Sequence, residues 1–262
     1  YHANLCEKLL VLSLAKICNY VPGAGIWLNT QRPEWNDANN ALVGNGTSMV
    51  TVYYLKRFLE FFKKLTSQIR IDNIDISLEV LLWFNEVEKT MFKYKNINHS
   101  TISDQDRMDY VSSFGKIFGN YRKKIYSNGF STSKRLSLNK LRSFISTICN
   151  QFDETILINY SKNGLFDAYN TINIDSKNES IDVKKLDVML EGQVAGLSCK
   201  SQNSNNKVLT LKSLFSSNLY RPDMRSFILY PEKNNTPFLE KNIIRPDTLK
   251  RSSLLNKMVA EK

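Results

Sequence analysis

The stretch from Asn29 to Val50 reads N-T-Q-R-P-E-W-N-D-A-N-N-A-L-V-G-N-G-T-S-M-V and differs from the amphipathic sequence on either side. It contains two carboxylates, Glu34 and Asp37, with an arginine, a tryptophan, several asparagines and two glycines. Pro33 favours an extended chain at the residue before it, and Gly44 favours the end of any helix that begins near Asp37. Loops placed between helices in this way commonly carry binding and catalytic groups.

The two carboxylates are expected to differ in acidity. Asp37 stands where a short helix is predicted to begin, and the helix dipole stabilises its anion. Glu34 is next to Trp35, and desolvation there would raise its pKa toward that of a general acid, an effect that the Arg32 guanidinium would oppose. Cleavage of a glycosidic bond needs two such carboxylates, because one protonates the leaving oxygen and the other activates water or acts as nucleophile. The alternative interpretation is a polar loop that caps two helices, since capping uses the same residue types.

The run R-P-E-W-N-D-A-N-N-A-L-V-G at 32–44 resembles the active-site segment of bacterial six-hairpin, (α/α)6-toroid glycosidases. It is loosely similar to inverting glycoside hydrolases and disaccharide phosphorylases. The stretches L-E-G-Q-V-A at 190–195 and L-Y-R-P-D at 219–223 are similar to segments of the same class. The resemblance implies an all-α fold of antiparallel helical hairpins, forming a complete or incomplete toroid, and a carbohydrate-active function.

The resemblance also implies roles for individual residues. Glu34 is the expected general acid with Asp37 beside it, and Glu191 is the expected base, with Asp167 and Asp223 as rivals. The expected substrate-binding residues are Arg32, Trp35, Asn39, Asn40, Trp27, Tyr220, Arg221 and Asp223. The simpler alternatives are that Glu191 is a surface residue, that the tryptophans fill the core, and that Arg221 and Asp223 only hold a loop.

Apolar residues recur every three or four positions over the first 160 residues, which predicts long amphipathic helices. The predicted helices cover about 3–20, 47–69, 77–94, a range after Ser103, 138–156, 187–199 and 208–216. From residue 161 onward, short alternation, polar linkers and irregular segments interrupt the helices. We therefore predict one mainly all-α domain over 1–262, with long helices in 1–160 and a loop-rich continuation with short strands or loops in 161–262.

The net charge of +11 comes from 36 basic and 25 acidic residues, dispersed along the predicted helices. No nucleic-acid-binding motif accompanies it, so we predict a solvated basic surface and no nucleic-acid partner. A polyanion-binding helical protein remains the alternative that rests on charge alone. No apolar run approaches the roughly 20 residues that span a bilayer, so no membrane partner is expected.

The four cysteines, at positions 6, 18, 149 and 199, form no C-x-x-C pair, and there are only two histidines. A metal site would therefore have few ligands, and neither a metal nor a cofactor is expected. Free buried thiols favour the cytoplasm, and a disulfide remains an alternative. The first residue is Tyr1, without a basic segment before an apolar one, so the remainder of a larger polypeptide is an expected partner.

The expected function is cleavage of a glycosidic bond in an oligosaccharide or disaccharide by general acid/base catalysis. The alternative is a non-catalytic carbohydrate-binding or structural helical module derived from such an enzyme.

Overall fold

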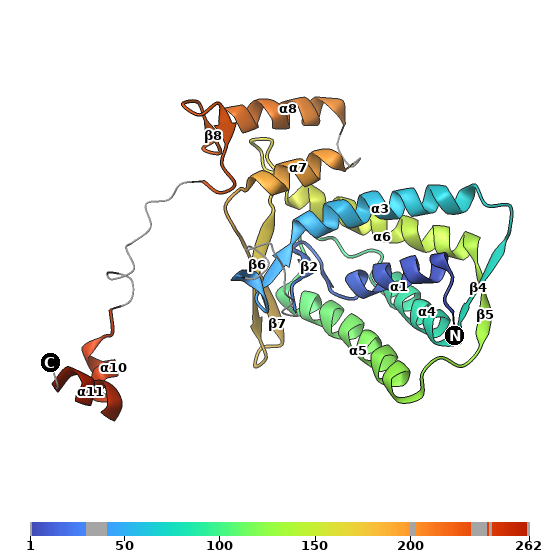
Figure 1. Ribbon diagram of the computed structural model, residues 1–262, viewed down its shortest axis with the longest axis horizontal. Coiled ribbons are helices and arrows are strands. Elements are labelled where there is room, and N and C mark those ends of the chain that lie inside the picture. Colours follow the sequence, from blue (N-terminus) through green and yellow to red (C-terminus); the bar gives the residue numbers. More distant parts are fainter. Residues whose placement is uncertain (1, 30–40, 200–202, 232–239, 241–242, 261–262) are drawn as a thin grey trace. The chain divides into compact units, whose positions relative to one another are not determined.

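The computed structural model describes residues 2–29, 41–199, 203–231, 240 and 243–260. The contacts divide the chain into two compact units, Tyr1–Pro231 and Glu232–Lys262. The first unit contains the sheets and the long helices (Figure 1). The two helices described in the second unit contain no buried residue.

The helices of the first unit form where the apolar spacing predicts them. In the part of this unit that is described they are α1 (Leu5–Ile17), α3 (Met49–Ser67), α4 (Leu78–Lys93), α5 (Asp104–Asn128), α6 (Leu138–Ile158), α7 (Leu190–Ser198) and α8 (Ser204–Phe215). Most begin at a side chain that accepts a hydrogen bond from the backbone N–H three residues later: Asn4, Ser48, Ser77, Ser103, Ser137 and Asn203. These caps satisfy N–H groups that have no partner inside the helix.

The helices pack around one large apolar core. Helix α3 lies against α6 and α7, and α4 lies against α1 and α5 (Figure 1). The apolar stripes face this core, as Leu141, Ile145 and Ile148 of α6 do. Many of the largest fully buried side chains are aromatic, among them Tyr20, Tyr53, Tyr110, Phe84, Phe114 and Phe152.

A curled five-stranded antiparallel sheet forms a half-barrel at one end of the helices (Figure 1). Its strands in spatial order are β1 (Tyr20–Val21), β2 (Gly25–Trp27), β3 (Gly46–Ser48), β6 (Tyr169–Asp175) and β7 (Ser180–Lys185). Strands β2 and β3 approach closely because Gly25, at φ +123°, has no side chain; a Cβ there would lie 2.8 Å from the Ser48 carbonyl oxygen. Ser48 pairs with Tyr169, which joins two segments far apart in the sequence.

Two small antiparallel ribbons complete the first unit. Strands β4 (Asn73–Ser77) and β5 (Ser133–Ser137) pair along their whole length and lead directly into α4 and α6. Strands β8 (Tyr220–Arg221) and β9 (Ser226–Phe227) form a hairpin after α8. The first ribbon ties the start of α4 to the start of α6.

The expected all-α, six-hairpin toroid is therefore wrong. The fold is mixed α/β, with 56% of residues in helices and 16% in strands, and its sheet curls into a half-barrel. Apolar spacing did not reveal β1, β2 and β3 because strands of two or three residues are too short to show alternation. Their partners are also set by tertiary pairing, which a local pattern does not contain.

The second unit contains α10 (Pro246–Lys250) and α11 (Ser253–Ala260). Pro246 occupies the start of α10, where its missing N–H costs no hydrogen bond. Leu254, Met258 and Val259 of α11 are each more than half exposed.

Candidate functional site

A cavity of about 820 Å³ lies between α1 and α5 of the first unit. Val11 and Ala15 line it from α1, Val111 and Phe118 from α5, and Trp83 from α4, which packs against both helices. A volume of this size falls in the range typical of small-molecule sites. We call this hollow the α1–α5 cavity.

Two glycines on α5 leave room for the cavity. Gly115 and Gly119 are one helical turn apart, so they lie on the same face of the helix. A Cβ added at either position would meet no atom within 4 Å. Because both glycines line the cavity, the α5 wall has no side chain at these two positions.

Aromatic rings form the deep part of the cavity. Trp83 is 2% exposed, and its ring stacks against Phe118 and Tyr121 with centroid separations of 5.1 and 4.1 Å. Its Nε1 lies near the buried thiol of Cys18, a weak acceptor, without forming a hydrogen bond of normal geometry. Burial raises the pKa of Cys18 to about 12, so this sulfur stays protonated at neutral pH.

Amide groups and a second indole line the end of the cavity beside β2. The half-buried Trp27 donates its Nε1–H to the Gly44 carbonyl oxygen at 3.0 Å. Asn29 donates from Nδ2 to Asn19 Oδ1 at 2.5 Å, and Asn19 donates from Nδ2 to the Ala15 carbonyl oxygen at 2.8 Å. This end therefore offers an aromatic face together with fixed polar amides.

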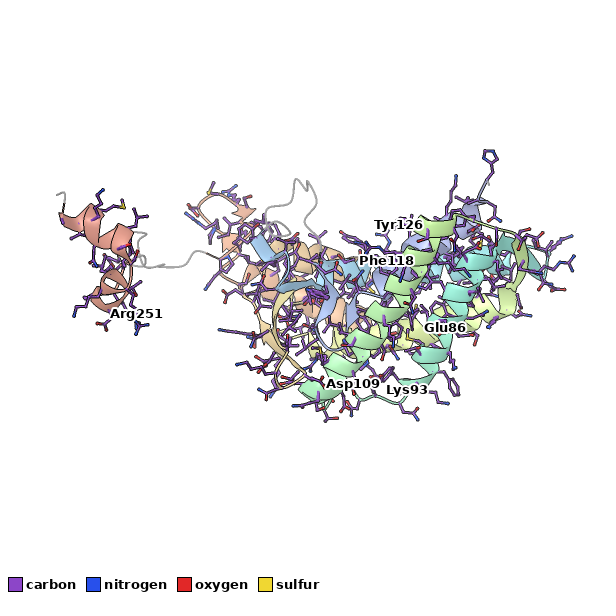
Figure 2. All side chains as sticks on the ribbon, turned by 90° about the horizontal axis from the view of Figure 1, so that it is seen from below. Glu86, Lys93, Asp109, Phe118, Tyr126 and Arg251 are labelled. Carbon is purple, nitrogen blue, oxygen red and sulfur yellow. The ribbon has the colours of Figure 1, made fainter. Side chains whose placement is uncertain are left out.

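Within the part of the chain that the structure describes, the charged side chains that line the cavity are all positive. Lys16 of α1 and Arg122 of α5 line the cavity, and no aspartate or glutamate does. The Arg122 guanidinium carbon lies 5.7 Å from the ring centroid of Phe118 and 5.9 Å from that of Tyr126. Figure 2 shows α5 with Asp109 toward one end, Phe118 in its middle and Tyr126 toward the other end.

Most residues of the predicted site fall in the segment 30–40. Arg32, Glu34, Trp35, Asp37, Asn39 and Asn40 lie outside the residues that the structure describes. The described chain on either side, at Asn29 and at Val43, lines the α1–α5 cavity. Trp27, another predicted substrate-binding residue, also lines it.

The later predicted residues do not line this cavity. Glu191 lies in the first turn of α7, next to Gly192, whose added Cβ would lie 3.0 Å from the Phe166 carbonyl oxygen and from Ala168. The space beside Gly192 is thus filled by residues 166–168. Asp167, the rival base, is 5% exposed and accepts a hydrogen bond from Lys185 Nζ at 2.7 Å. Burial raises its pKa and Lys185 opposes that shift.

The predicted residues of the β8–β9 hairpin pack against their neighbours. Tyr220 contacts the rings of Phe215 and Phe227 at centroid separations of 5.1 and 5.2 Å. Arg221 and Asp223 form an ion pair at 3.0 Å, and this hydrogen-bonded pairing lowers the pKa of Asp223. The structure therefore brings Trp27 to the cavity, and places Glu191 and this hairpin elsewhere.

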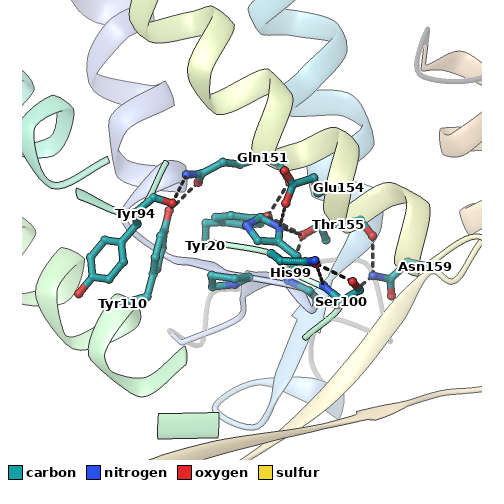
Figure 3. Close-up of polar contacts among 12 residues, drawn as sticks. Tyr20, Tyr94, His99, Ser100, Tyr110, Gln151, Glu154, Thr155 and Asn159 are labelled. Atoms are coloured by element: carbon teal, nitrogen blue, oxygen red, sulfur yellow. Dashed lines mark hydrogen bonds and ion pairs between the residues drawn. The ribbon is translucent and has the colours of Figure 1, made fainter. Parts of the chain in front are cut away.

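A buried polar network is the other concentration of titratable groups. His99 Nδ1 lies 3.0 Å from Thr155 Oγ1 and 3.3 Å from the Tyr20 hydroxyl (Figure 3). The Tyr20 hydroxyl donates to the Gln151 carbonyl oxygen, and Gln151 Oε1 accepts from Tyr110. Burial, followed by the nearby Arg107, lowers the pKa of His99 to about 4, so the ring is neutral at pH 7. His99 Nδ1 also lies 3.8 Å from the carboxylate of Glu154, whose side chain is about half exposed. The network joins β1, the loop before α5, α5 itself and α6.

Asn19, Gly115, Gly119 and Arg122 were not among the residues predicted from the sequence. The local signal for the three residues of α5 is the Gly-x-x-x-Gly spacing, followed by Arg122 three residues after the second glycine. Such spacing indicates a bare helix face, and only the tertiary structure shows that α1 leaves that face uncovered.

No group of three or more metal-ligating side chains occurs among the residues whose positions are described. Over the same residues, no helix has the length and apolar character required to cross a bilayer. The cysteines at 6, 18, 149 and 199 are free thiols, as predicted.

No protein-family model matches the sequence, and a search of curated proteins finds none with significant similarity.

Proposed function

We propose that this chain is a carbohydrate-active protein that binds a saccharide in the α1–α5 cavity. The observation that carries the proposal is the lining beside β2, where the half-buried Trp27 adjoins the amides of Asn19 and Asn29. The apolar C–H faces of a sugar ring pack on aromatic rings, while its hydroxyls need hydrogen-bonding groups. A cavity of about 820 Å³ is large enough to hold a saccharide.

We further propose that the bound saccharide is cleaved at a glycosidic bond, with Glu34 as general acid. In this mechanism Glu34 gives its proton to the leaving oxygen, and a second carboxylate, for which Asp37 is the candidate nearest in sequence, activates the attacking water. Support comes from the sequence of 29–50 and from the position of the flanking residues Asn29 and Val43 in the cavity wall. Carboxyl separations of about 5 Å lead to retention and of 6.5–9.5 Å to inversion, so the product anomer reports the spacing.

The second candidate function is saccharide binding without cleavage. The observation that favours it is the lack of a carboxylate among the described cavity-lining residues, together with the location of Glu191 in α7. Both candidates share the binding site and differ only in turnover.

The deciding experiment measures binding and cleavage on one set of variants. Wild-type protein is titrated calorimetrically with defined neutral and acidic oligosaccharides, and products are separated by chromatography. We expect Trp27→Ala to weaken binding about tenfold or more, because it removes a stacking face. Phe92→Ala, which removes an exposed ring of α4 outside the cavity, is the control and should leave binding unchanged.

Glu34→Gln separates the two candidates. Under the cleavage mechanism it lowers the rate about a hundredfold or more with binding retained, whereas the exposed Glu86→Gln of α4 has no effect. Tight binding without product formation supports the binding module. Absence of Trp27-dependent binding to any saccharide would overturn the proposed function.

A further inference from the structure

We propose that the α1–α5 cavity selects an acidic saccharide, with Arg122 binding the anionic group. The inference rests on the proposed function, since it specifies the class of sugar that the same cavity takes. Its basis is the position, the surroundings and the chemistry of Arg122.

Arg122 lies far from the sheet end of the cavity. Near the start of α5, Arg107 donates from Nε to the Pro22 carbonyl oxygen and from Nη1 to the Ile181 carbonyl oxygen, which fixes that end against the half-barrel. At 1.5 Å per residue, Arg122 is about 22 Å further along the helix axis. Arg122 is thus placed to contact a different part of a bound oligosaccharide from Trp27 and Asn29, which belong to the sheet end.

The exposed Arg122 side chain lies near two aromatic rings. Phe118 and Tyr126 are four residues before and after it, so all three lie on one face of α5. The guanidinium lies near both rings, and such contacts stabilise a cation without using its N–H donors. Within the described chain, Arg122 makes no hydrogen bond or ion pair, which leaves its planar fork of donors available to a ligand.

A carboxylate matches the geometry of this fork. Guanidinium and carboxylate form two parallel N–H···O bonds, and a neutral hydroxyl forms only one weaker contact. Lys16 adds positive charge from the opposite wall. Because Lys16 stands in the last turn of α1, where a cation also offsets the helix dipole, we assign the selective contact to Arg122.

The test compares saccharides that differ only in charge. A trimer of galacturonic acid and its methyl ester are titrated into the full chain by calorimetry at low and at high salt, with the sulfate ester of a neutral trimer as a third probe. We expect the wild-type protein to bind the acidic trimer at least about tenfold more tightly than the ester, with the preference shrinking as salt rises. Tighter binding of the acid than of the sulfate ester assigns the site to carboxylates.

Arg122→Gln should abolish the preference while leaving affinity for the ester unchanged. Arg122→Lys should keep part of it, because a point charge replaces a bidentate fork. Lys116→Gln and Lys123→Gln remove exposed cations of α5 that do not line the cavity, and both should behave as wild type.

Three results would overturn the inference. Equal, Trp27-dependent binding of acid and ester would remove the selectivity and leave the proposed function standing. If Lys123→Gln and Arg122→Gln weakened binding of the acidic trimer equally, the preference would reflect a general attraction of polyanions to the basic surface. Failure of both trimers and of every neutral saccharide to bind would remove the proposed function and the inference together.

Discussion

At the scale of single residues, His99 links the stability of the fold to pH. Its ring is 4% exposed and its Nε2 has no hydrogen-bonding partner among the described residues, so protonation inside the core is unfavourable. The folded-state pKa of about 4 lies below the ordinary value of 6.5. The unfolded chain therefore binds the proton more readily, and the contribution of His99 is complete above about pH 6.5 and is lost as the pH falls toward 4.

We expect the free energy of unfolding to fall by on the order of 3 kcal/mol over that range through His99 alone. Urea unfolding curves at several pH values between 4 and 7 measure it. His99→Gln is neutral throughout, so the difference in pH slope between wild type and variant isolates the histidine. Identical slopes in the two proteins would contradict the assignment.

Two glycines in helices should respond in opposite ways to the same substitution. A Cβ at Gly196 of α7 would lie 2.5 Å from the Phe166 ring. Gly196→Ala therefore forces repacking and should lower the free energy of unfolding by about 1–3 kcal/mol. Gly119 of α5 meets nothing within 4 Å, so Gly119→Ala should stabilise by up to about 1 kcal/mol through lower backbone entropy. Denaturant titration of both variants tests this, and two changes of the same sign would contradict the packing at one of them.

At this scale the sequence predicted Trp27 but not Arg122. A tryptophan near a motif is conspicuous, whereas Arg122 is one of many basic residues in the chain. It becomes a candidate only because Phe118, Tyr126, Gly115 and Gly119 surround it. The roles of Glu34 and Asp37 remain predictions from the sequence.

At the scale of elements, Glu7 fixes α1 against α4. The Glu7 carboxylate is 1% exposed and accepts hydrogen bonds from the backbone N–H and the hydroxyl of Ser77, at 3.0 and 2.5 Å. Ser77 is the N-cap of α4, so an anion from α1 meets the positive end of the α4 dipole. This contact sets the position of one wall of the cavity.

Glu7→Ala should lower the free energy of unfolding by about 1–3 kcal/mol, because it leaves the Ser77 N–H buried without its acceptor. Glu7→Gln retains an acceptor and should cost less. The exposed Glu86→Ala on α4 is the matched control, with an expected change below about 0.5 kcal/mol. A loss in Glu7→Ala no larger than in the control would show that the contact contributes little.

The helices could be predicted from the sequence, whereas the only signal of the sheet was the short alternation after residue 161, where β6 and β7 lie. Long helices such as α6 carry several apolar turns, and the serine at the start of each adds a second signal. Strands β1, β2 and β3 have no such repetition. In the sheet β3 lies between β2 and β6, and its pairing with β6 joins segments far apart in the sequence. The half-barrel is a property of tertiary contacts, which is why an all-helical interpretation appeared sufficient.

At the scale of the whole molecule, the first unit should be stable without the second. All three tryptophans lie before residue 231, and no residue described in α10 or α11 is buried. A chain ended after Pro231 should therefore unfold in urea with a free energy within about 0.5 kcal/mol of the full chain. Tryptophan fluorescence follows the first unit alone, and a loss above about 1 kcal/mol would show that 232–262 contributes to its stability.

The pairing of β3 with β6 has a consequence for synthesis on the ribosome. Ser48 emerges 121 positions before its partner Tyr169. At translation rates of 5–20 residues per second, the free edge of β3 waits roughly 6 to 24 seconds for β6. The nascent chain can assemble α3 and α4 in that interval, while the sheet stays open at the edge of β3, and chaperones can bind that edge until β6 emerges.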